Sequence, residues 1–298
     1  MAGKRASNPP DGSYSDGWRT FSKLLLRPGI RMTMRLDWRG QEHIPADGPV
    51  ILAINHLSYM DILAIGLFVD SARRYPVFLA KSSLFKIPVL GYVIGKLGQL
   101  PVYRGQADAA LVLRRAAELA RKNNACVIFY PESTVTRDPD KWPMVAKTGV
   151  ARLALEIGAP VVPVAHWGAQ RILPYGTVLP RLLPRKTVRV AAGPAVDLSE
   201  FAGQPPNTQV LRAVTDKIML AVTGLVGELR GETPPVRPYQ PLGPLRPGKP
   251  DGAVPAPRQD ALAQPAAGQQ DPHEQSPDQQ APDQQDLRAR DQQVLRRP

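Results

Sequence analysis

Hydrophobic and polar residues alternate strictly over residues 31–39, and this period of two predicts a β-strand with one buried face. The apolar positions of this strand are Met32, Met34, Leu36 and Trp38. The preceding residues 18–27 place apolar side chains at helical spacing, with cations four residues apart beside them. That pattern predicts a short amphipathic helix, which we expect to end at Pro28-Gly29. A basic helix of this kind can lie on an anionic membrane surface.

Farther along the chain, short apolar runs alternate with longer amphipathic stretches. The runs predict strands at residues 49–55, 76–80, 99–103, 125–130, 160–166 and 186–193. The amphipathic stretches predict helices at residues 59–68, 87–96, 107–123, 148–157 and 208–229. Strands that alternate with helices are typical of an α/β fold. We therefore predict a single α/β domain with a mostly parallel or mixed sheet flanked by helices.

Composition divides the chain into three parts. Residues 1–13 are polar and are expected to be disordered, whereas residues 14–230 are expected to form the domain. Residues 231–298 hold 14 of the 33 prolines and repeat the sequence Asp-Gln-Gln. Such a segment buries too little apolar surface to offset its ordering entropy, so we expect a disordered tail.

Cysteine content and the length of the apolar runs bear on the location of the protein. The one cysteine, Cys126, lies in an apolar run that reads as a buried strand, so no disulfide can form within the chain. The N-terminal residues lack the apolar segment of a signal peptide. The apolar runs are shorter than the roughly 20 residues of a membrane span. We expect a cytoplasmic protein, bound peripherally at the inner face of the plasma membrane.

The net charge of +12 is concentrated before the tail. Residues 1–230 hold 30 Lys and Arg against 17 Asp and Glu, whereas residues 231–298 hold 8 against 9. A domain this basic fits an anionic partner, such as nucleic acid, an anionic membrane face or a phosphorylated substrate. Because no nucleic-acid-binding motif is found in the sequence, we expect no nucleic acid partner.

The segment N-H-L-S-Y-M-D, residues 55–61, follows a predicted buried strand. Reactive groups in α/β folds often lie where a strand ends and a helix begins. If His56 lies on the turn and Asp61 in the first helical turn, the carboxylate can accept from one ring nitrogen. The other nitrogen is then left to take a proton from a hydroxyl. Two plainer interpretations stay open: His56 packs or caps at the strand end, and Ser58 with Asp61 forms a capping box.

Charged residues follow two more of the predicted strands. Arg104 comes as one strand ends, where its guanidinium could face a phosphate or simply solvent. The strand at 125–130 runs into a loop that contains Glu132, Ser133, Thr134 and Arg137. A charged group directly after a core strand needs a partner or a function. Lys147 then precedes a helix, whose N-terminus can hold an anion.

A fourth segment, Val161-Val162-Pro163-Val164, reads as a core strand that could line an acyl channel and leads to His166. In this order, the four segments resemble the motifs of the glycerolipid acyltransferase family, best known through 1-acylglycerol-3-phosphate acyltransferases. Those motifs are N-H-x-x-x-x-D, an arginine at a strand end, F-P-E-G-T-R and an apolar V-P-V strand. The matching residues are Asn55, His56, Asp61, Arg104, Pro131, Glu132, Thr134 and Val162-Pro163-Val164.

The resemblance covers about residues 30–195, and this sequence departs from it at two positions. Ser133 stands where the family has glycine. Val135 stands where the family has arginine, and the nearest arginine, Arg137, lies two residues farther on. Two residues shift a side chain by up to about 7 Å along an extended chain, so whether Arg137 replaces the family arginine stays open.

The resemblance implies a glycerol-3-phosphate acyltransferase-like fold and a role for each matching residue. His56 would be the general base, oriented by Asp61, and would deprotonate an acceptor hydroxyl as it attacks a thioester carbonyl. The residues expected to bind the substrate phosphate and headgroup are Arg104, Glu132, Ser133, Thr134, Arg137 and Lys147. No covalent acyl-enzyme is needed, because the sequence has no G-x-S-x-G nucleophile elbow and its one cysteine is expected in the core. No metal is implied, because the four histidines show no ligand spacing. No cofactor is expected, since the thioester donor is a co-substrate.

We therefore expect an acyltransferase of phospholipid biosynthesis. It would move a fatty acyl group from acyl-CoA or acyl carrier protein to the free hydroxyl of 1-acylglycerol 3-phosphate, giving phosphatidic acid. Its expected partners are that thioester donor, a lysophosphatidic acid-like lipid and an anionic membrane surface. One alternative is the same chemistry on another lysophospholipid or anionic lipid. An alternative from a different class is a catalytically inactive basic module that binds lipid surfaces.

Overall fold

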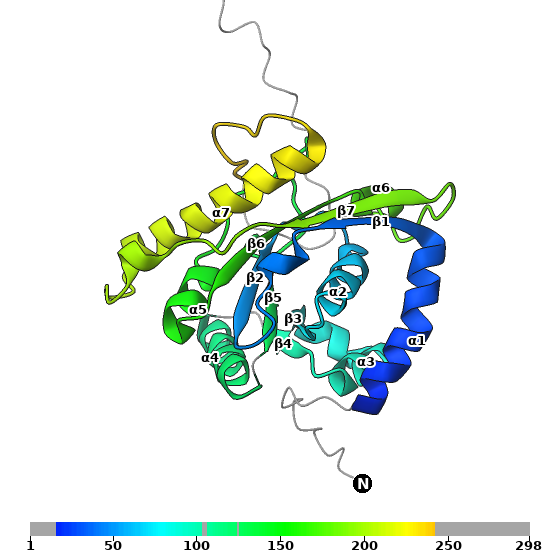
Figure 1. Ribbon diagram of the computed structural model, residues 1–298, viewed down its shortest axis with the longest axis horizontal. Helices are drawn as coiled ribbons and strands as arrows, with labels where there is room; N and C mark the ends of the chain where they lie inside the picture. The colour runs from blue at the N-terminus through cyan, green and yellow to red at the C-terminus, as the bar shows by residue number, and fades with distance from the viewer. Residues whose placement is uncertain (1–15, 103–105, 124, 242–298) are drawn as a thin grey trace, which may run out of the picture. The chain divides into compact units, whose positions relative to one another are not determined.

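The computed structural model of the chain describes residues 16–102, 106–123 and 125–241. Within these residues, seven strands form one sheet in the order β1-β7-β6-β2-β5-β3-β4 (Figure 1). The strands are β1 (Met34–Arg39), β2 (Val50–Ile54), β3 (Pro76–Lys81), β4 (Leu100–Val102), β5 (Cys126–Phe129), β6 (Val161–Trp167) and β7 (Lys186–Ala192). Neighbouring strands are parallel except for β6 and β7, which are antiparallel. The predicted α/β fold with a mixed sheet is confirmed.

Helices cover both faces of this sheet. They are α1 (Asp16–Thr33), α2 (Asp61–Ser71), α3 (Leu90–Lys96), α4 (Gln106–Asn123), α5 (Gly149–Ile157), α6 (Ala169–Ile172) and α7 (Thr208–Arg230), with short 3-10 helices η1 (Gln41–His43), η2 (Ser82–Lys86) and η3 (Ser199–Phe201). One hydrophobic cluster packs α1, α2 and α6 on one face, and another packs α4, α5 and α7 on the opposite face (Figure 1). None of the helices in the described part of the chain has the length and hydropathy needed to cross a membrane.

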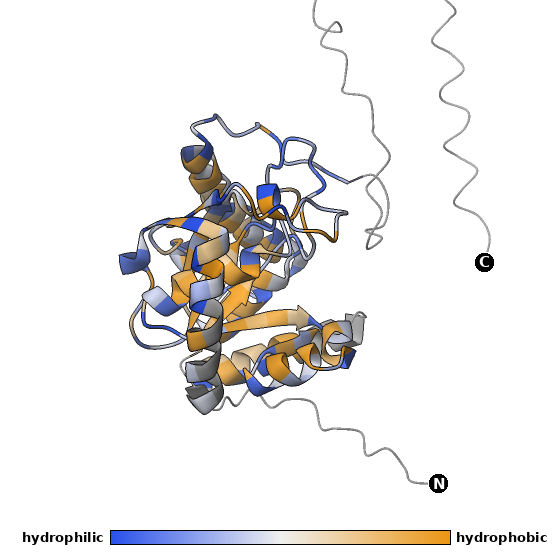
Figure 2. Ribbon diagram, turned by 90° about the vertical axis from the view of Figure 1, so that its right-hand side faces the viewer, coloured by the Kyte–Doolittle hydropathy of each residue, from blue (hydrophilic) through white to orange (hydrophobic). Residues whose placement is uncertain are grey.

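Strand β2 lies inside the sheet and is buried on both faces. Ile51 and Ala53 belong to the cluster under α4, α5 and α7, whereas Leu52 and Ile54 belong to the cluster under α1 and α2. All four side chains are fully buried. A strand in this position carries a continuous apolar run, because neither face meets water. Figure 2 shows such apolar strands in orange inside the domain.

The first helix is longer than predicted. Helix α1 continues through Pro28 to Thr33, so Met32 is an exposed helical residue and not the first buried position of a strand. The expected stop at Pro28-Gly29 is wrong because contacts outside the local sequence hold the next turn. Ile30 is buried in the core, and Arg27 pairs with Asp70 of α2. The predicted amphipathic face of residues 18–27 lies mostly outside the described side chains.

The ordered chain extends beyond the predicted boundary at Arg230. Tyr239 forms a bridge with Met144, and the carbonyl of Tyr239 accepts a hydrogen bond from the N–H of Val145 at 3.0 Å. The prediction of a disordered tail is therefore wrong for residues 231–241, because backbone contacts order a segment whose composition is that of a loop. The rest of the predicted tail lies outside the described residues.

Arg230, at the end of α7, contacts the loop after β5. Its guanidinium carbon lies 4.0 Å from the ring centroid of Trp142 and 4.5 Å from that of Trp167. A cation between two aromatic rings is attracted to both. Arg230 also donates to the carbonyl of Asp140 at 2.7 Å and pairs with Glu232.

Truncation tests the new boundary. A chain that ends at Arg230 loses the hydrogen bond between Tyr239 and Val145 and the left-handed cap at Gly231, which has φ 69°. Together these contribute about 1–2 kcal/mol, so we expect the melting temperature to fall by about 2–8 °C. A chain that ends at Pro241 should have the same melting temperature as the full chain, and calorimetry can measure both. Equal melting of the two truncated chains would show that residues 231–241 do not stabilise the domain.

Candidate active site

Titratable side chains gather at the carboxyl ends of β2, β5 and β6. His56 follows β2, Tyr130 and Glu132 follow β5, and His166 lies near the end of β6. Because β2 is parallel to both neighbours, these three ends meet at one edge of the sheet. Helix α2 begins at Asp61, beside the same edge. Among the described residues, no group of three or more His, Cys, Asp and Glu side chains is arranged to hold a metal ion.

His56 and Asp61 form the predicted pair. Nδ1 of His56 lies 2.8 Å from Oδ2 of Asp61, and the side chains are 14% and 0% exposed, respectively. An ionised Asp61 favours the tautomer with the proton on Nδ1, which leaves Nε2 to accept a proton. The imidazole stacks on the ring of Tyr130 with centroids 4.3 Å apart, and the phenol donates to Oδ1 of Asp61 at 3.3 Å. One orientation of His56 is thus stabilised from two directions.

The turn between β2 and α2 is organised around the same carboxylate. Oδ2 of Asp61 accepts the N–H groups of Leu57 at 3.2 Å and Ser58 at 3.3 Å. The hydroxyl of Ser58 in turn accepts the N–H of Met60 at 3.1 Å. Only half of the predicted capping box is present, because the N–H of Asp61 donates to the backbone carbonyl of Ser58 and not to its hydroxyl. The N-cap residue of α2 is Met60, and it has no side-chain capping hydrogen bond. The carboxylate of Asp61 therefore binds the turn and His56 without a complete capping box.

His166 is a second histidine in contact with Asp61. Its Nε2 lies 3.2 Å from Oδ2 of Asp61 and 2.9 Å from the carbonyl oxygen of Asn55. The N–H of His166 donates to Oδ1 of Asn55 at 2.9 Å, and Nδ2 of Asn55 donates to the carbonyl of His166 at 3.2 Å. Nδ1 of His166 is buried and has no hydrogen-bond partner among the described residues. Both oxygens near Nε2 are acceptors, so this geometry favours a proton on Nε2.

No site role was predicted for His166. It follows an apolar run that correctly predicted β6 as a core strand, and a core position did not suggest a contact with Asp61. A usable signal was present, because a histidine inside a strand buried on both faces requires a polar partner. Asn55 at the end of β2 was the matching polar residue.

Burial and hydrogen bonding set the ionisation of these groups. Burial by itself would raise the pKa of Asp61, but His56 and His166 hold that pKa well below its usual range. Burial lowers the pKa of His56, yet the charge and hydrogen bond of Asp61, aided by Glu132, outweigh burial and leave the pKa raised. Burial and the neighbouring Asp61 raise the pKa of Tyr130 well above its ordinary value. At neutral pH the site therefore combines a carboxylate, a neutral phenol and an imidazole of increased basicity.

Glu132 is buried and joins two backbone segments to the site. Its Oε1 accepts the N–H of His56 at 3.0 Å, and its Oε2 accepts the N–H of Met144 at 3.0 Å. Burial raises the pKa of Glu132 to about 7, although both N–H groups favour the charged form. The N–H of Thr136 also donates to the carbonyl of His56 at 2.8 Å. The observed contacts of Glu132 thus position His56, and its predicted contact with the acceptor stays a prediction.

The loop after β5 shows what the two departures from the family pattern mean physically. Ser133 has φ 60°, a left-handed conformation that glycine adopts freely and other residues adopt at a cost of about 1–2 kcal/mol. Val135, at the family's arginine position, is buried and fills space in the interior. Thr134 and Arg137 are half-buried on the same loop. Arg104 lies outside the described residues, so its predicted contact with phosphate stays a prediction.

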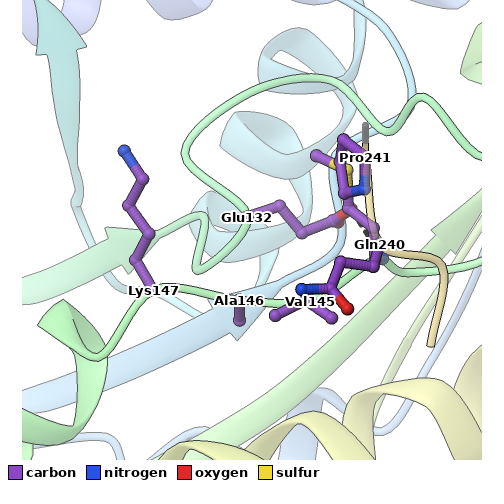
Figure 3. Close-up of a pocket in the computed structure, with 7 residues that line it drawn as sticks. Glu132, Val145, Ala146, Lys147, Gln240 and Pro241 are labelled. Atoms are coloured by element: carbon purple, nitrogen blue, oxygen red, sulfur yellow. Dashed lines mark hydrogen bonds between the residues drawn. The ribbon is translucent and has the colours of Figure 1, made fainter. Parts of the chain in front are cut away.

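A small cavity borders Glu132. Its volume is about 170 Å³, and its lining residues are Glu132, Met144, Val145, Ala146, Lys147, Gln240 and Pro241 (Figure 3). Lys147 is exposed, and its side chain extends away from the Glu132 carboxylate (Figure 3). The backbone N–H of Lys147 donates to the carbonyl of Pro131 at 3.0 Å. Lys147 therefore stands at the edge of this cavity, and its predicted role in binding an anion stays a prediction.

The stretch of chain that contains this arrangement matches a known family model. Residues 35–167 match the family model described as Acyltransferase. This stretch contains the pair His56 and Asp61 and both groups that position it, Glu132 and His166.

Curated relatives have names of the same kind. The chloroplastic 1-acyl-sn-glycerol-3-phosphate acyltransferase BAT2 of Brassica napus is 33% identical over 162 residues, which are 53% of this chain and 44% of that protein. The lyso-ornithine lipid O-acyltransferase of Pseudomonas aeruginosa is 33% identical over 120 residues, which are 39% of this chain and 42% of that protein. The chain thus spans less than half the length of these two relatives.

A solved structure extends the similarity beyond the matched stretch. The crystal structure of PlsC, the 1-acyl-sn-glycerophosphate acyltransferase of Thermotoga maritima, is similar with a TM-score of 0.54 and 26% identity. The similarity covers 72% of this chain and 80% of that one. Residues 35–167, which hold the whole arrangement around Asp61, match the Acyltransferase family model, and the chain is similar to proteins named acyltransferases.

Proposed function

We propose that this chain transfers a fatty acyl group from acyl-CoA or acyl carrier protein to the free hydroxyl of 1-acylglycerol 3-phosphate, giving phosphatidic acid. The observation that carries the proposal is a partly exposed His56 whose Nδ1 lies 2.8 Å from the buried carboxylate of Asp61. A general base that deprotonates a hydroxyl needs this arrangement. The printed names of BAT2 and PlsC support the choice of acceptor.

The proposed reaction returns the enzyme to its starting protonation state. Nε2 of His56 takes the proton of the acceptor hydroxyl while the oxygen bonds to the thioester carbonyl carbon. Asp61 stabilises the imidazolium that forms. When the tetrahedral intermediate collapses, the carbon–sulfur bond breaks and the imidazolium gives its proton to the leaving thiolate. No residue of the chain is acylated in this sequence.

A second acceptor class has its own support. Val135 is buried at the position where the family has an arginine, which alters the loop expected to contact the headgroup. The similarity to a lyso-ornithine lipid O-acyltransferase points the same way. The alternative is the same chemistry on another lysophospholipid or anionic lipid, with Arg104, Thr134 and Arg137 as the proposed headgroup ligands. The location at the inner face of the plasma membrane stays a prediction.

An acceptor panel tests the function directly. Purified protein is incubated with labelled acyl-CoA or acyl carrier protein and with lysophospholipids that differ only in headgroup. We expect the fastest transfer to 1-acylglycerol 3-phosphate. The His56→Ala variant should lose at least about 10²-fold in kcat, the lower range of the contribution of a positioned base. Transfer that persists in His56→Ala would reject the mechanism, and labelled donor unconsumed with every acceptor would favour an inactive lipid-binding module.

The pH dependence of transfer should reflect the environment of His56. An imidazole acts as a base only when neutral, and the pKa of His56 is raised above the ordinary value of about 6.5. We therefore expect kcat/KM to rise with pH through a midpoint above 6.5. Asp61→Asn removes the carboxylate that raises this pKa, so its residual activity should show a midpoint shifted downward.

The control for this profile is Glu132→Gln, because Glu132 also titrates near neutrality, with a pKa of about 7. If His56 is the titrating base, the acidic limb persists in Glu132→Gln. If the limb disappears in Glu132→Gln and is unmoved in Asp61→Asn, then Glu132 and not His56 controls it.

His166 should act through Asp61 as a positioning residue. The His166→Leu variant removes one donor from the carboxylate, so more of its negative charge acts on His56. We expect the pKa of His56 to rise further, because the carboxylate of Asp61 loses a competing hydrogen-bond donor. NMR titration of the imidazole measures this pKa. The matched variant His166→Gln keeps an N–H donor and should leave it nearly unchanged, and equal shifts in both would contradict the assignment.

A further inference from the structure

The loop between α6 and β7, residues 173–185, holds apolar side chains in water. Val178, Leu179 and Leu183 are 96%, 79% and 82% exposed. Single exposed apolar residues are ordinary on a protein surface, but a contiguous group marks a contact surface. Burying such side chains is strongly favourable, so contact with an apolar environment would stabilise this loop.

The loop and its flanks are also purely basic. Residues 171–186 contain Arg171, Arg181, Arg185 and Lys186 and neither Asp nor Glu. Arg181 is exposed and follows Leu179 by two positions. Apolar side chains beside cations match the interface of an anionic bilayer, where the apolar groups enter the acyl boundary and the cations stay near the headgroups.

Internal contacts brace this loop in its exposed conformation. The N–H of Arg181 donates to the carbonyl of Ile172 at 2.7 Å. The ammonium of Lys186 donates to the carbonyls of Arg181 at 2.7 Å and Leu183 at 3.0 Å. The base of the loop is therefore closed by polar contacts while its apolar tip stays in solvent.

The loop is also tied to the end of α1. Nη2 of Arg185 donates to the carbonyl of Met34 at 3.2 Å and to the carbonyl of Arg31. Exposed Met32 lies between these two residues. Figure 1 shows the α6–β7 loop beside this end of α1. One exposed apolar residue of α1 is thus adjacent in sequence to a residue that the loop contacts.

The first residues of the loop touch the catalytic turn. The hydroxyl of Ser58 donates to the carbonyl of Leu173 at 2.8 Å. The ring of Tyr175 lies 6.4 Å from the ring of Tyr59, which lies 6.2 Å from the imidazole of His56. A surface that docks through this loop would bring its lipids close to the accessible edge of the site.

We propose that the α6–β7 loop inserts Val178, Leu179 and Leu183 into the surface of an anionic lipid bilayer and so presents His56 to lipid acceptors. The choice of a bilayer rests on the proposed function, which requires a lipid substrate. It is also favoured by the near-complete exposure of Val178 at a protruding tip, because a protein partner would have to supply a matching concave apolar surface. Acyl carrier protein and a second copy of this chain are the competing occupants.

An environment-sensitive probe on the loop tests insertion without relying on catalysis. Cys126 is buried, and burial raises its pKa to about 12, so a cysteine introduced as Leu179→Cys is labelled selectively with nitrobenzoxadiazole. We expect its fluorescence to increase and shift to the blue on adding phosphatidylcholine vesicles that contain phosphatidylglycerol. The matched probe site is Leu220→Cys on α7, which is 74% exposed and should not respond.

Vesicle sedimentation then measures the contribution of the loop. The triple variant Val178→Ser, Leu179→Ser, Leu183→Ser should partition at least about tenfold less to these vesicles, a loss of about 1.4 kcal/mol. Arg181→Gln should weaken binding about fivefold to anionic vesicles and not to pure phosphatidylcholine. The matched control, Leu220→Ser with Val236→Ser, changes exposed apolar residues elsewhere and should bind like the unaltered chain.

The outcomes separate this proposal from the proposed function. A probe at residue 179 that responds to vesicles in a chain without acyltransferase activity supports docking and rejects only the activity. Normal transfer to a short-chain, water-soluble acceptor with no vesicle response at residue 179 overturns docking alone. Docking is equally overturned if the probe responds only to acyl carrier protein. It also fails if light scattering shows a dimer that the triple serine variant abolishes.

Discussion

A carboxylate with no exposed surface is the constraint on which the rest of the site depends. Removing the charge of Asp61 from water is unfavourable unless donors replace its hydration. Those donors come from the turn after β2, from Tyr130 after β5 and from the imidazoles of His56 and His166. Asp61 can remain ionised only where β2, β5 and β6 lie side by side. The order of strands in the sheet therefore brings together the donors of Asp61, and the ionised Asp61 in turn raises the pKa of His56.

The elements predicted correctly from the sequence are those whose pattern of buried and exposed positions is visible in their own residues. Strand β2 is apolar throughout because it is buried on both faces, and α7 carries one buried stripe, so their predicted bounds lie within one residue of those observed. The failures occur where distant contacts decide. Helix α1 passes through Pro28 because Ile30 is buried against other elements. Residues 231–241 are ordered by the loop after β5, a partner that their own composition does not reveal.

Within the site, the same distinction separates what could be predicted from what could not. His56 and Asp61 belong to one short motif at a strand–helix junction, so their pairing follows from local geometry. His166 comes from a strand much farther along the chain, and only the adjacency of β2 and β6 brings it to Asp61. The motif around Glu132 correctly predicted that this residue lies at the site, but it did not predict the contacts that Glu132 makes there. Its family context suggested substrate binding, whereas its two carboxylate oxygens accept backbone N–H groups that fix His56 and the loop after β5.

The turn between β2 and α2 joins a buried carboxylate to a partly exposed imidazole. The side chain of Asp61 is fully buried, whereas that of His56 is 14% exposed. Backbone N–H groups of the turn hold the carboxylate, and the hydroxyl of Ser58 reaches outward to the α6–β7 loop. The segment that orients the imidazole is thus the one joined to an exposed apolar loop. If a ligand of that loop strengthens the binding of a second ligand at His56, the second ligand must strengthen binding at the loop by the same coupling free energy, because linkage between two sites is reciprocal.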